Sequence, residues 1–174
     1  MTTTWDVYES PLGPLTVEAG PLGLTAISFP GAGGAARDEG RRDPTALAEA
    51  VVQLDAYFAG ERRAFDLALD LRGTPFQRRV WAELRRLPYG ATVTYTELAA
   101  AVGRPEVVRA VAAAVGRTPV PIVVPCHRVV GAGGALTGYG GGLQRKAALL
   151  DLEARVAAGG QPEPAWALRQ LALL

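Results

Sequence analysis

The sequence is poor in reactive side chains, with one cysteine and one histidine in 174 residues. A single cysteine excludes an internal disulfide and a cysteine-rich zinc site, and its scarcity gives no sign of secretion. No apolar stretch approaches the roughly 20 residues of a membrane-spanning helix, and the first residues lack the basic and apolar pattern of a signal peptide. We therefore expect a cytoplasmic protein that has no metal, no cofactor and no membrane partner.

Charge is unevenly distributed along the chain, although the net charge is only +1. Residues 1–71 carry eleven acidic and five basic side chains, whereas residues 72–128 carry nine arginines and three glutamates. A basic segment beside an acidic one is typical of a localised polyanion-binding face. Arginines also often do no more than solvate helix surfaces, so charge alone leaves both interpretations open.

The only cysteine and the only histidine are neighbours in Pro125-Cys126-His127-Arg128. A thiolate is a strong nucleophile, and an imidazole is a common acceptor for the thiol proton. A lone cysteine is also often a small buried hydrophobe. Three prolines within residues 118–125 exclude a helix and predict a stiff extended segment before Cys126. Seven glycines in residues 131–142 predict a loop that turns tightly or approaches a ligand closely.

The first part of the chain has the pattern of a small antiparallel sheet followed by a helix. Strands are predicted at residues 5–10, 15–19 and 24–29, separated by Pro-Leu-Gly turns. Asp43 is a suitable cap for a helix that has Pro44 in its first turn and ends at Gly60. We place the domain boundary between residues 60 and 73, which gives an N-terminal domain of residues 1–70.

The basic part has the pattern of several short helices. Thr74 and Pro75 begin an amphipathic helix, and the capping box Thr94-Tyr95-Thr96-Glu97 begins a second one. A third helix is predicted from Arg104-Pro105 to about Val115, which gives a helix-turn-helix. This last helix is mostly Ala and Val, with Arg109 as its one basic residue after Pro105, so it suits close approach to DNA better than reading of base edges.

Five motifs occur in the order and spacing of one known family. They are Arg-Ala-Val at 109–111, Pro-Val-Pro at 119–121, Pro-Cys-His-Arg-Val at 125–129, Gly-Tyr-Gly-Gly-Gly at 138–142 and Leu-Leu-Asp-Leu-Glu at 149–153. In them the chain resembles the O6-alkylguanine-DNA alkyltransferases, also called methylated-DNA–protein-cysteine methyltransferases. The resemblance is close over residues 74–155 and general over the first 70.

The resemblance implies an α/β (α+β) fold in three parts. A small ribonuclease-H-like α/β domain (residues 1–70) is followed by a mainly helical domain (residues 71–155) with the helix-turn-helix and the active-site loop. Residues 156–174 form a tail, in which Trp166, Leu168 and Leu171 are expected to pack back on the protein. We expect a monomer that binds double-stranded DNA containing O6-alkylguanine.

The resemblance also implies a single-turnover methyltransferase that repairs DNA. The alkyl group of O6-alkylguanine, or less readily of O4-alkylthymine, passes irreversibly to Cys126 after the base is flipped out of the duplex. In this mechanism His127 takes the thiol proton through a water, Glu153 orients the imidazole, and the Tyr95 hydroxyl serves the leaving guanine. Periodicity alone instead favours a solvated carboxylate late in a helix as the explanation of Glu153.

The remaining implied roles concern DNA and the base pocket. Arg109 is the expected finger that fills the vacated stack, and the first turns near Gln77 and Arg104 are expected to offer free amides to phosphates. The residues expected to contact DNA are Arg109, Tyr95, Thr96, Arg104, Gln77 and Arg128. In the pocket, the Val129 carbonyl is expected to accept from the exocyclic amine and the Gly140 N–H to donate to O6, between walls formed by Pro121 and Tyr139.

One departure from the family and three alternatives remain. Thr118 stands where many members have an asparagine that holds the hinge before the Pro-Val-Pro motif, and it lacks an amide donor. A protein that binds alkylated DNA without reacting is the first alternative, but such relatives lack the cysteine. A helix-turn-helix regulator with a sensor cysteine needs base-reading side chains at residues 105–115. A cysteine hydrolase needs the Cys-His pair but no DNA-binding helix.

Overall fold

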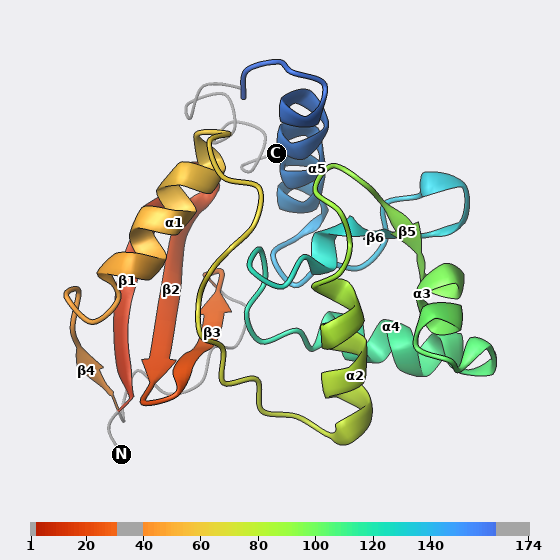
Figure 1. The fold of residues 1–174 in the computed structure, drawn as a ribbon, viewed down its shortest axis with the longest axis horizontal. Helices are drawn as coiled ribbons and strands as arrows, with labels where there is room; N and C mark the ends of the chain where they lie inside the picture. Colours follow the sequence, from red (N-terminus) through yellow and green to blue (C-terminus); the bar gives the residue numbers. More distant parts are fainter. Residues whose placement is uncertain (1–2, 31–39, 163–174) are drawn as a thin grey trace.

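The structure is a computed structural model that describes residues 3–30 and 40–162. A sheet covered by one helix lies beside a group of helices, and a long helix stands between the two at the top of the view (Figure 1). This arrangement confirms the predicted α+β class. The tail residues Trp166, Leu168 and Leu171 lie outside the described part of the chain.

The N-terminal part is a four-stranded sheet in the order β3-β2-β1-β4. Its strands are β1 (Thr4–Ser10), β2 (Gly13–Gly20), β3 (Gly23–Ser28) and the short β4 (Arg41–Arg42). The first three pair antiparallel, as predicted, whereas β4 pairs parallel with β1. Helix α1 (Ala48–Phe58) lies along this sheet (Figure 1).

Helix α1 begins later than the sequence indicated. The Asp43 carboxylate accepts a hydrogen bond from the Ala46 N–H at 3.1 Å, and the Leu47 N–H donates to the Pro44 carbonyl at 3.2 Å. These bonds close a separate turn before Ala48. Asp43 therefore caps this turn rather than the helix itself, which corrects the prediction.

The second part begins with α2 (Pro75–Leu84), followed by α3 (Tyr95–Ala101) and α4 (Val108–Gly116). Thr74 and Thr94 each form a capping box with the residue three positions later, so local sequence fixes where α2 and α3 start. The predicted third helix is interrupted: a 3₁₀ turn, η1 (Pro105–Val107), precedes α4. The Trp81 indole N–H donates to the Ala114 carbonyl at 2.9 Å and fixes α2 against α4.

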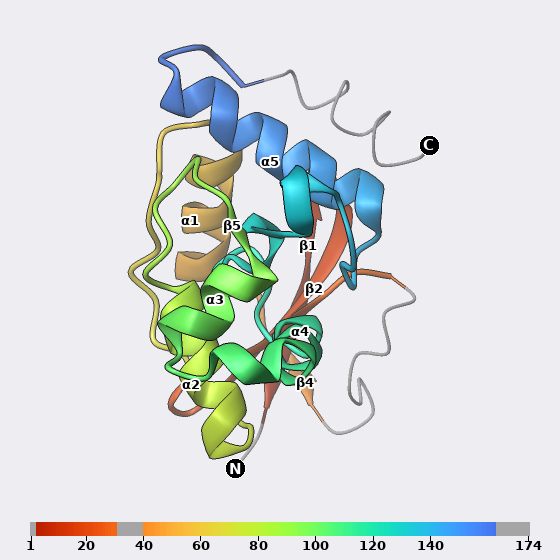
Figure 2. The same cartoon turned by 90° about the vertical axis from the view of Figure 1, so that its right-hand side faces the viewer.

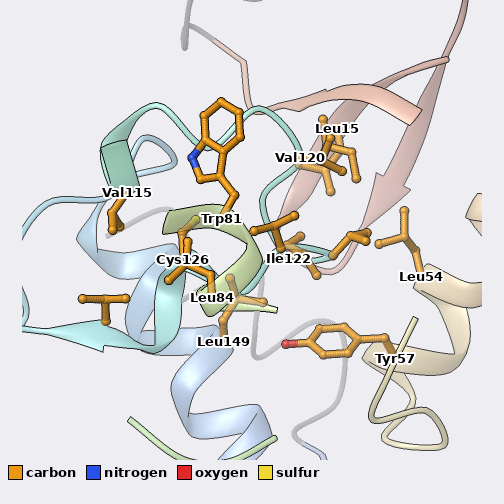
Figure 3. Close-up of a cluster of buried hydrophobic side chains, with 14 of the residues drawn as sticks. Leu15, Leu54, Tyr57, Trp81, Leu84, Val115, Val120, Ile122, Cys126 and Leu149 are labelled. Atoms are coloured by element: carbon orange, nitrogen blue, oxygen red, sulfur yellow. The ribbon is translucent and has the colours of Figure 1, made fainter. Parts of the chain in front are cut away.

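The segment that contains Cys126 lies between α4 and the last helix. It contains the 3₁₀ turn η2 (Cys126–Arg128), the strand β6 (Val129–Val130), which pairs parallel with β5 (Val93–Thr94), and the turn η3 (Ala132–Gly134). Cys126 lies within a buried cluster that includes Trp81, Leu84 and Leu149 (Figure 3).

Helix α5 (Leu143–Ala157) joins the two parts of the molecule. The Arg145 guanidinium donates to the Leu12 carbonyl at 3.0 Å, and Arg63 donates to the Val156 carbonyl at 3.1 Å. Figure 2 shows α5 crossing above α1 and the sheet. Within residues 3–30 and 40–162, no helix combines the length and apolar character needed to cross a bilayer.

Candidate active site

Cys126 is held at the start of η2 by a tightly folded segment. The sequence predicted an extended segment before Cys126. The prediction was wrong at one point, because the chain turns at Ile122, which has a φ of 75°. A β-branched residue rarely adopts this left-handed conformation, so the turn is a strained feature four residues before the cysteine. Cys126 itself is 6% exposed.

A cavity of about 290 Å³ opens beside Cys126. Of the residues predicted to form the base pocket, Pro121, Tyr139 and Gly140 line it. The opposite wall comes from the N-terminal sheet and was not foreseen; it consists of Ala26, Ile27, Ser28 and Phe29 at the end of β3. The site therefore lies between the two parts of the molecule.

Burial raises the pKa of the Cys126 thiol to about 11. The Thr118 hydroxyl, the backbone amides at Cys126 and His127, and the charge of Lys146 act in the opposite direction but do not outweigh burial. In the free protein at neutral pH, Cys126 is therefore a thiol that needs a proton acceptor before it can attack.

His127 is fully buried, and its Nε2 lies 2.7 Å from Oε1 of Glu153. A carboxylate oxygen only accepts, so Nε2 carries the proton, and the neutral ring keeps a lone pair on Nδ1. Nδ1 is buried and has no hydrogen-bond partner among the residues that the structure describes. Burial lowers the pKa of His127, which keeps the ring neutral and Nδ1 able to accept a proton.

Glu153 is held by donors from three separate segments, and it is therefore not the solvated carboxylate that its position in α5 also allowed. Arg128 donates from Nε to Oε2 at 2.8 Å and from Nη2 to Oε1 at 2.9 Å. The Tyr57 hydroxyl donates to Oε1 at 2.8 Å, and the Gly90 N–H donates to Oε2 at 3.1 Å. Burial alone raises the pKa of Glu153, but the bonds from His127 and Arg128 outweigh it and hold the pKa well below its usual value.

Arg128 is a correction to the predicted DNA contacts. It is 6% exposed, and besides Glu153 its guanidinium donates to the Leu87 carbonyl at 2.6 Å. A guanidinium that is buried in this way does not reach a phosphate. Its charge instead balances that of Glu153 inside the protein.

Lys146, the only lysine of the chain, is fully buried under the active-site loop. Its ammonium donates to the carbonyls of Val129, Thr137 and Gly138. The structure therefore differs from the expectation for Val129, whose carbonyl is bound to Lys146 and which does not line the cavity. A carbonyl oxygen has a second lone pair, but the carbonyl of Val129 faces an ammonium inside the protein.

The helix-turn-helix carries the other predicted DNA contacts. Arg109 on α4 and Thr96 on α3 are exposed. Arg104 is also exposed, but its guanidinium pairs with Glu106 at 2.6 Å and its N–H donates to the Ala99 carbonyl. The expected free amide at Arg104 is thus occupied.

Gln77 and Tyr95 also have partners within the protein. The Gln77 N–H donates to the Thr74 hydroxyl and its side chain accepts from the Thr74 N–H, so the amide expected to be free is used by the capping box. The Tyr95 hydroxyl donates to the Thr137 carbonyl at 3.3 Å, which places it against the active-site loop but not in the cavity lining. No group of three His, Cys, Asp or Glu side chains within the described ranges is arranged to hold a metal ion.

Comparison with known proteins agrees with this geometry. The family model for "6-O-methylguanine DNA methyltransferase, ribonuclease-like domain" matches residues 3–71, and that for the "DNA binding domain" of the same family matches residues 75–155. The methylated-DNA–protein-cysteine methyltransferase of Mycobacterium tuberculosis is 51% identical over 151 residues, which cover 83% of this chain and 88% of that protein. The chain belongs to the 6-O-methylguanine DNA methyltransferase family.

Two solved structures extend the similarity to the whole fold. Mycobacterium tuberculosis OGT in complex with DNA shares 49% identity and a TM-score of 0.81, over 90% of this chain and 94% of that one. The O6-methylguanine methyltransferase structure from the same organism shares 47% identity and a TM-score of 0.84, over 94% and 96% of the two chains. The present chain thus shares its fold with a protein that has been crystallised in complex with DNA.

Besides the cavity wall from β3, two polar residues that contact the methyltransferase site were not predicted from the sequence. Tyr57 has the spacing of a core residue in α1, and nothing local indicates that its hydroxyl reaches Glu153. Lys146 gives a weak signal, because a lone lysine among apolar residues of a predicted helix is unusual.

Proposed function

We propose that this methyltransferase removes alkyl groups from O6-alkylguanine in duplex DNA, and less readily from O4-alkylthymine, by transferring them irreversibly to Cys126. The observation that carries the proposal is the position of the thiol: Cys126 lines a cavity, and the next residue along the chain, His127, is hydrogen-bonded to Glu153. The cavity lies next to the C-terminal end of α4, the helix that carries Arg109.

The chemistry needs one proton acceptor and one leaving group. The thiol proton passes to Nδ1 of His127 through a water, while Glu153 accepts from Nε2 and stabilises the imidazolium that forms. The sulfur attacks the alkyl carbon, the carbon–O6 bond breaks, and guanine leaves with the bonding electrons. Guanine then takes up a proton, for which the Tyr95 hydroxyl is the proposed donor. The thioether on Cys126 is the end product, so each molecule reacts once.

Access to the base requires that the nucleotide leave the duplex, at a cost of a few kcal/mol. Support for this step comes from α4, whose exposed Arg109 is the side chain proposed to fill the gap. The helix otherwise offers small apolar side chains that suit close approach in the minor groove. Thr96 on α3 and Arg104 at the turn are the proposed phosphate contacts. We propose the domain limits 1–70 and 71–155 with a tail at 156–174, and a monomer acting in the cytoplasm.

The test is the stoichiometry of transfer from a duplex whose O6-methylguanine carries a labelled methyl group. We expect transfer to stop at one methyl per protein molecule, and Cys126→Ser to transfer none. Tight binding without transfer indicates the non-reacting alternative, and continued turnover beyond one equivalent contradicts the irreversible thioether.

A further inference from the structure

The Tyr57 hydroxyl belongs to the N-terminal part of the protein but contacts the pair that activates Cys126. We propose that Tyr57 is a positioning residue for alkyl transfer, which holds the Glu153 carboxylate and limits how strongly that carboxylate draws on His127. This inference rests on the proposed function and adds to it a contribution from α1.

The geometry of this contact is well defined. Tyr57 is fully buried, and its hydroxyl lies 2.8 Å from Oε1 of Glu153. Its ring is wedged between Phe65, at a centroid distance of 5.3 Å, and Tyr89, at 6.1 Å. Figure 3 shows the hydroxyl pointing from α1 toward the region of Leu149 on α5. Because the ring is fixed in this way, the Tyr57 hydroxyl donates its hydrogen bond to Glu153.

The carboxylate oxygen that Tyr57 contacts is the one that accepts from His127. Oε1 of Glu153 receives the His127 Nε2–H at 2.7 Å, an Arg128 N–H at 2.9 Å and the Tyr57 O–H. Each further donor withdraws electron density from this oxygen, so less remains to stabilise a positive charge on the imidazole. Tyr57 thereby helps to keep His127 neutral, which is the form that accepts the thiol proton.

The surrounding charges make the balance between neutral and protonated His127 sensitive to one hydrogen bond. Burial raises the pKa of Tyr57 well above its usual value, so the phenol stays protonated and remains a donor. Arg128 and Lys146 both oppose a charged His127, while Glu153 favours it. Among the described residues, the titratable and charged groups around the His127–Glu153 pair are Tyr57, Tyr89, Tyr139, Arg128, Lys146 and Cys126.

The test compares Tyr57→Phe with Tyr8→Phe. The second variant is a matched control, because Tyr8 is also a buried phenol of the N-terminal part and donates to a carboxylate, Asp55, at 2.7 Å, but it does not touch the site. Reaction with free O6-benzylguanine is followed across pH, so that DNA binding does not enter. We expect Tyr57→Phe to shift the acid limb of the pH–rate profile to higher pH by about half to one pH unit. At a given pH on that limb, transfer is then roughly three- to tenfold slower. Tyr8→Phe should leave the limb where it is.

A second measurement does not depend on activity. Because His127 is the only histidine, the Hε1 proton of its ring gives one NMR signal in tag-free protein, and the titration of that signal reports the pKa directly. We expect this pKa to rise in Tyr57→Phe and to stay unchanged in Tyr8→Phe. If the variant melts at lower temperature but its rate limb and its histidine titration match the wild type, Tyr57 is structural only and the inference is wrong. If wild-type protein never reacts with O6-benzylguanine or alkylated duplex, the proposed function fails instead.

Discussion

His127 and Glu153 are joined by a hydrogen bond of 2.7 Å between Nε2 and Oε1, and both side chains are almost completely buried. The bond fixes the tautomer of the ring and leaves Nδ1 as the only proton acceptor of the imidazole. The same carboxylate also neutralises Arg128, so one side chain orients the imidazole and balances a buried cation.

The double role of Glu153 predicts a double loss in Glu153→Gln. The Arg128 charge stays buried without its partner, which we expect to lower the free energy of unfolding by about 3–5 kcal/mol. The imidazolium also loses its stabilising charge, so transfer from O6-benzylguanine should slow by about a hundredfold or more. Urea unfolding and single-turnover rates check the two effects.

Asp151→Asn is the control for this variant. Asp151 lies on the same helix and pairs with Arg155 at 2.6 Å, but its side chain is 43% exposed. An exposed pair of this kind contributes about 0.5 kcal/mol or less, so neither property should change appreciably. Equal effects of the two substitutions contradict the role of Glu153.

The lowered pKa of His127 predicts how the reaction depends on pH. In the proposed mechanism the neutral ring is the active form, so the transfer rate is expected to fall when acid protonates it. Because burial lowers this pKa, the transfer rate should stay level from neutral pH to below the ordinary histidine value of about 6.5 and decline only at lower pH. Rates measured with O6-benzylguanine between pH 5 and 9 test this, and a half-maximal rate at or above 6.5 contradicts it.

Arg109 is expected to serve base flipping and not the chemical step. Arg109→Ala should therefore slow repair of an O6-methylguanine duplex by at least about tenfold, since unstacking costs a few kcal/mol, while the rate with free O6-benzylguanine stays within about twofold. Arg78→Ala removes the same charge from the exposed surface of α2 and serves as the control. Equal losses on both substrates show that Arg109 has another role.

Thr118 has one hydroxyl proton for two acceptors. Its Oγ1 donates to the Val115 carbonyl at 2.8 Å, and the same hydroxyl lies within hydrogen-bonding reach of the Cys126 sulfur, where it lowers the thiol pKa. We expect Thr118→Val to slow alkylation of Cys126 by iodoacetamide several-fold, and Thr118→Asn, which brings two amide protons, to speed it. Identical rates in wild type and Thr118→Val show that the hydroxyl does not assist the thiolate.

Features that depend on neighbouring residues could be predicted from the sequence. The capping box at Thr94 places the start of α3, and the alternation of apolar residues gives the strands. The Pro-Cys-His-Arg motif likewise singles out Cys126, which lines the cavity. The start of α1 was missed because Asp43 closes a competing local turn, whose bonds replace the cap.

Features that depend on distant segments could not be predicted in this way. Tyr57 and Glu153 are 96 positions apart, and they meet only because α1 and α5 pack together. Arg128 looks like any basic residue of a DNA-binding segment until its burial beside Glu153 is known. Tertiary packing, and not local pattern, decides which polar side chains turn inward.

The central claim is that Cys126 itself accepts the alkyl group. The most direct measurement is mass analysis of the peptide that contains Cys126 during incubation with a duplex that carries O6-methylguanine. We predict that this peptide gains one methyl group in step with the loss of O6-methylguanine, until every protein molecule has reacted. Repair of the duplex while Cys126 remains unmodified contradicts the account.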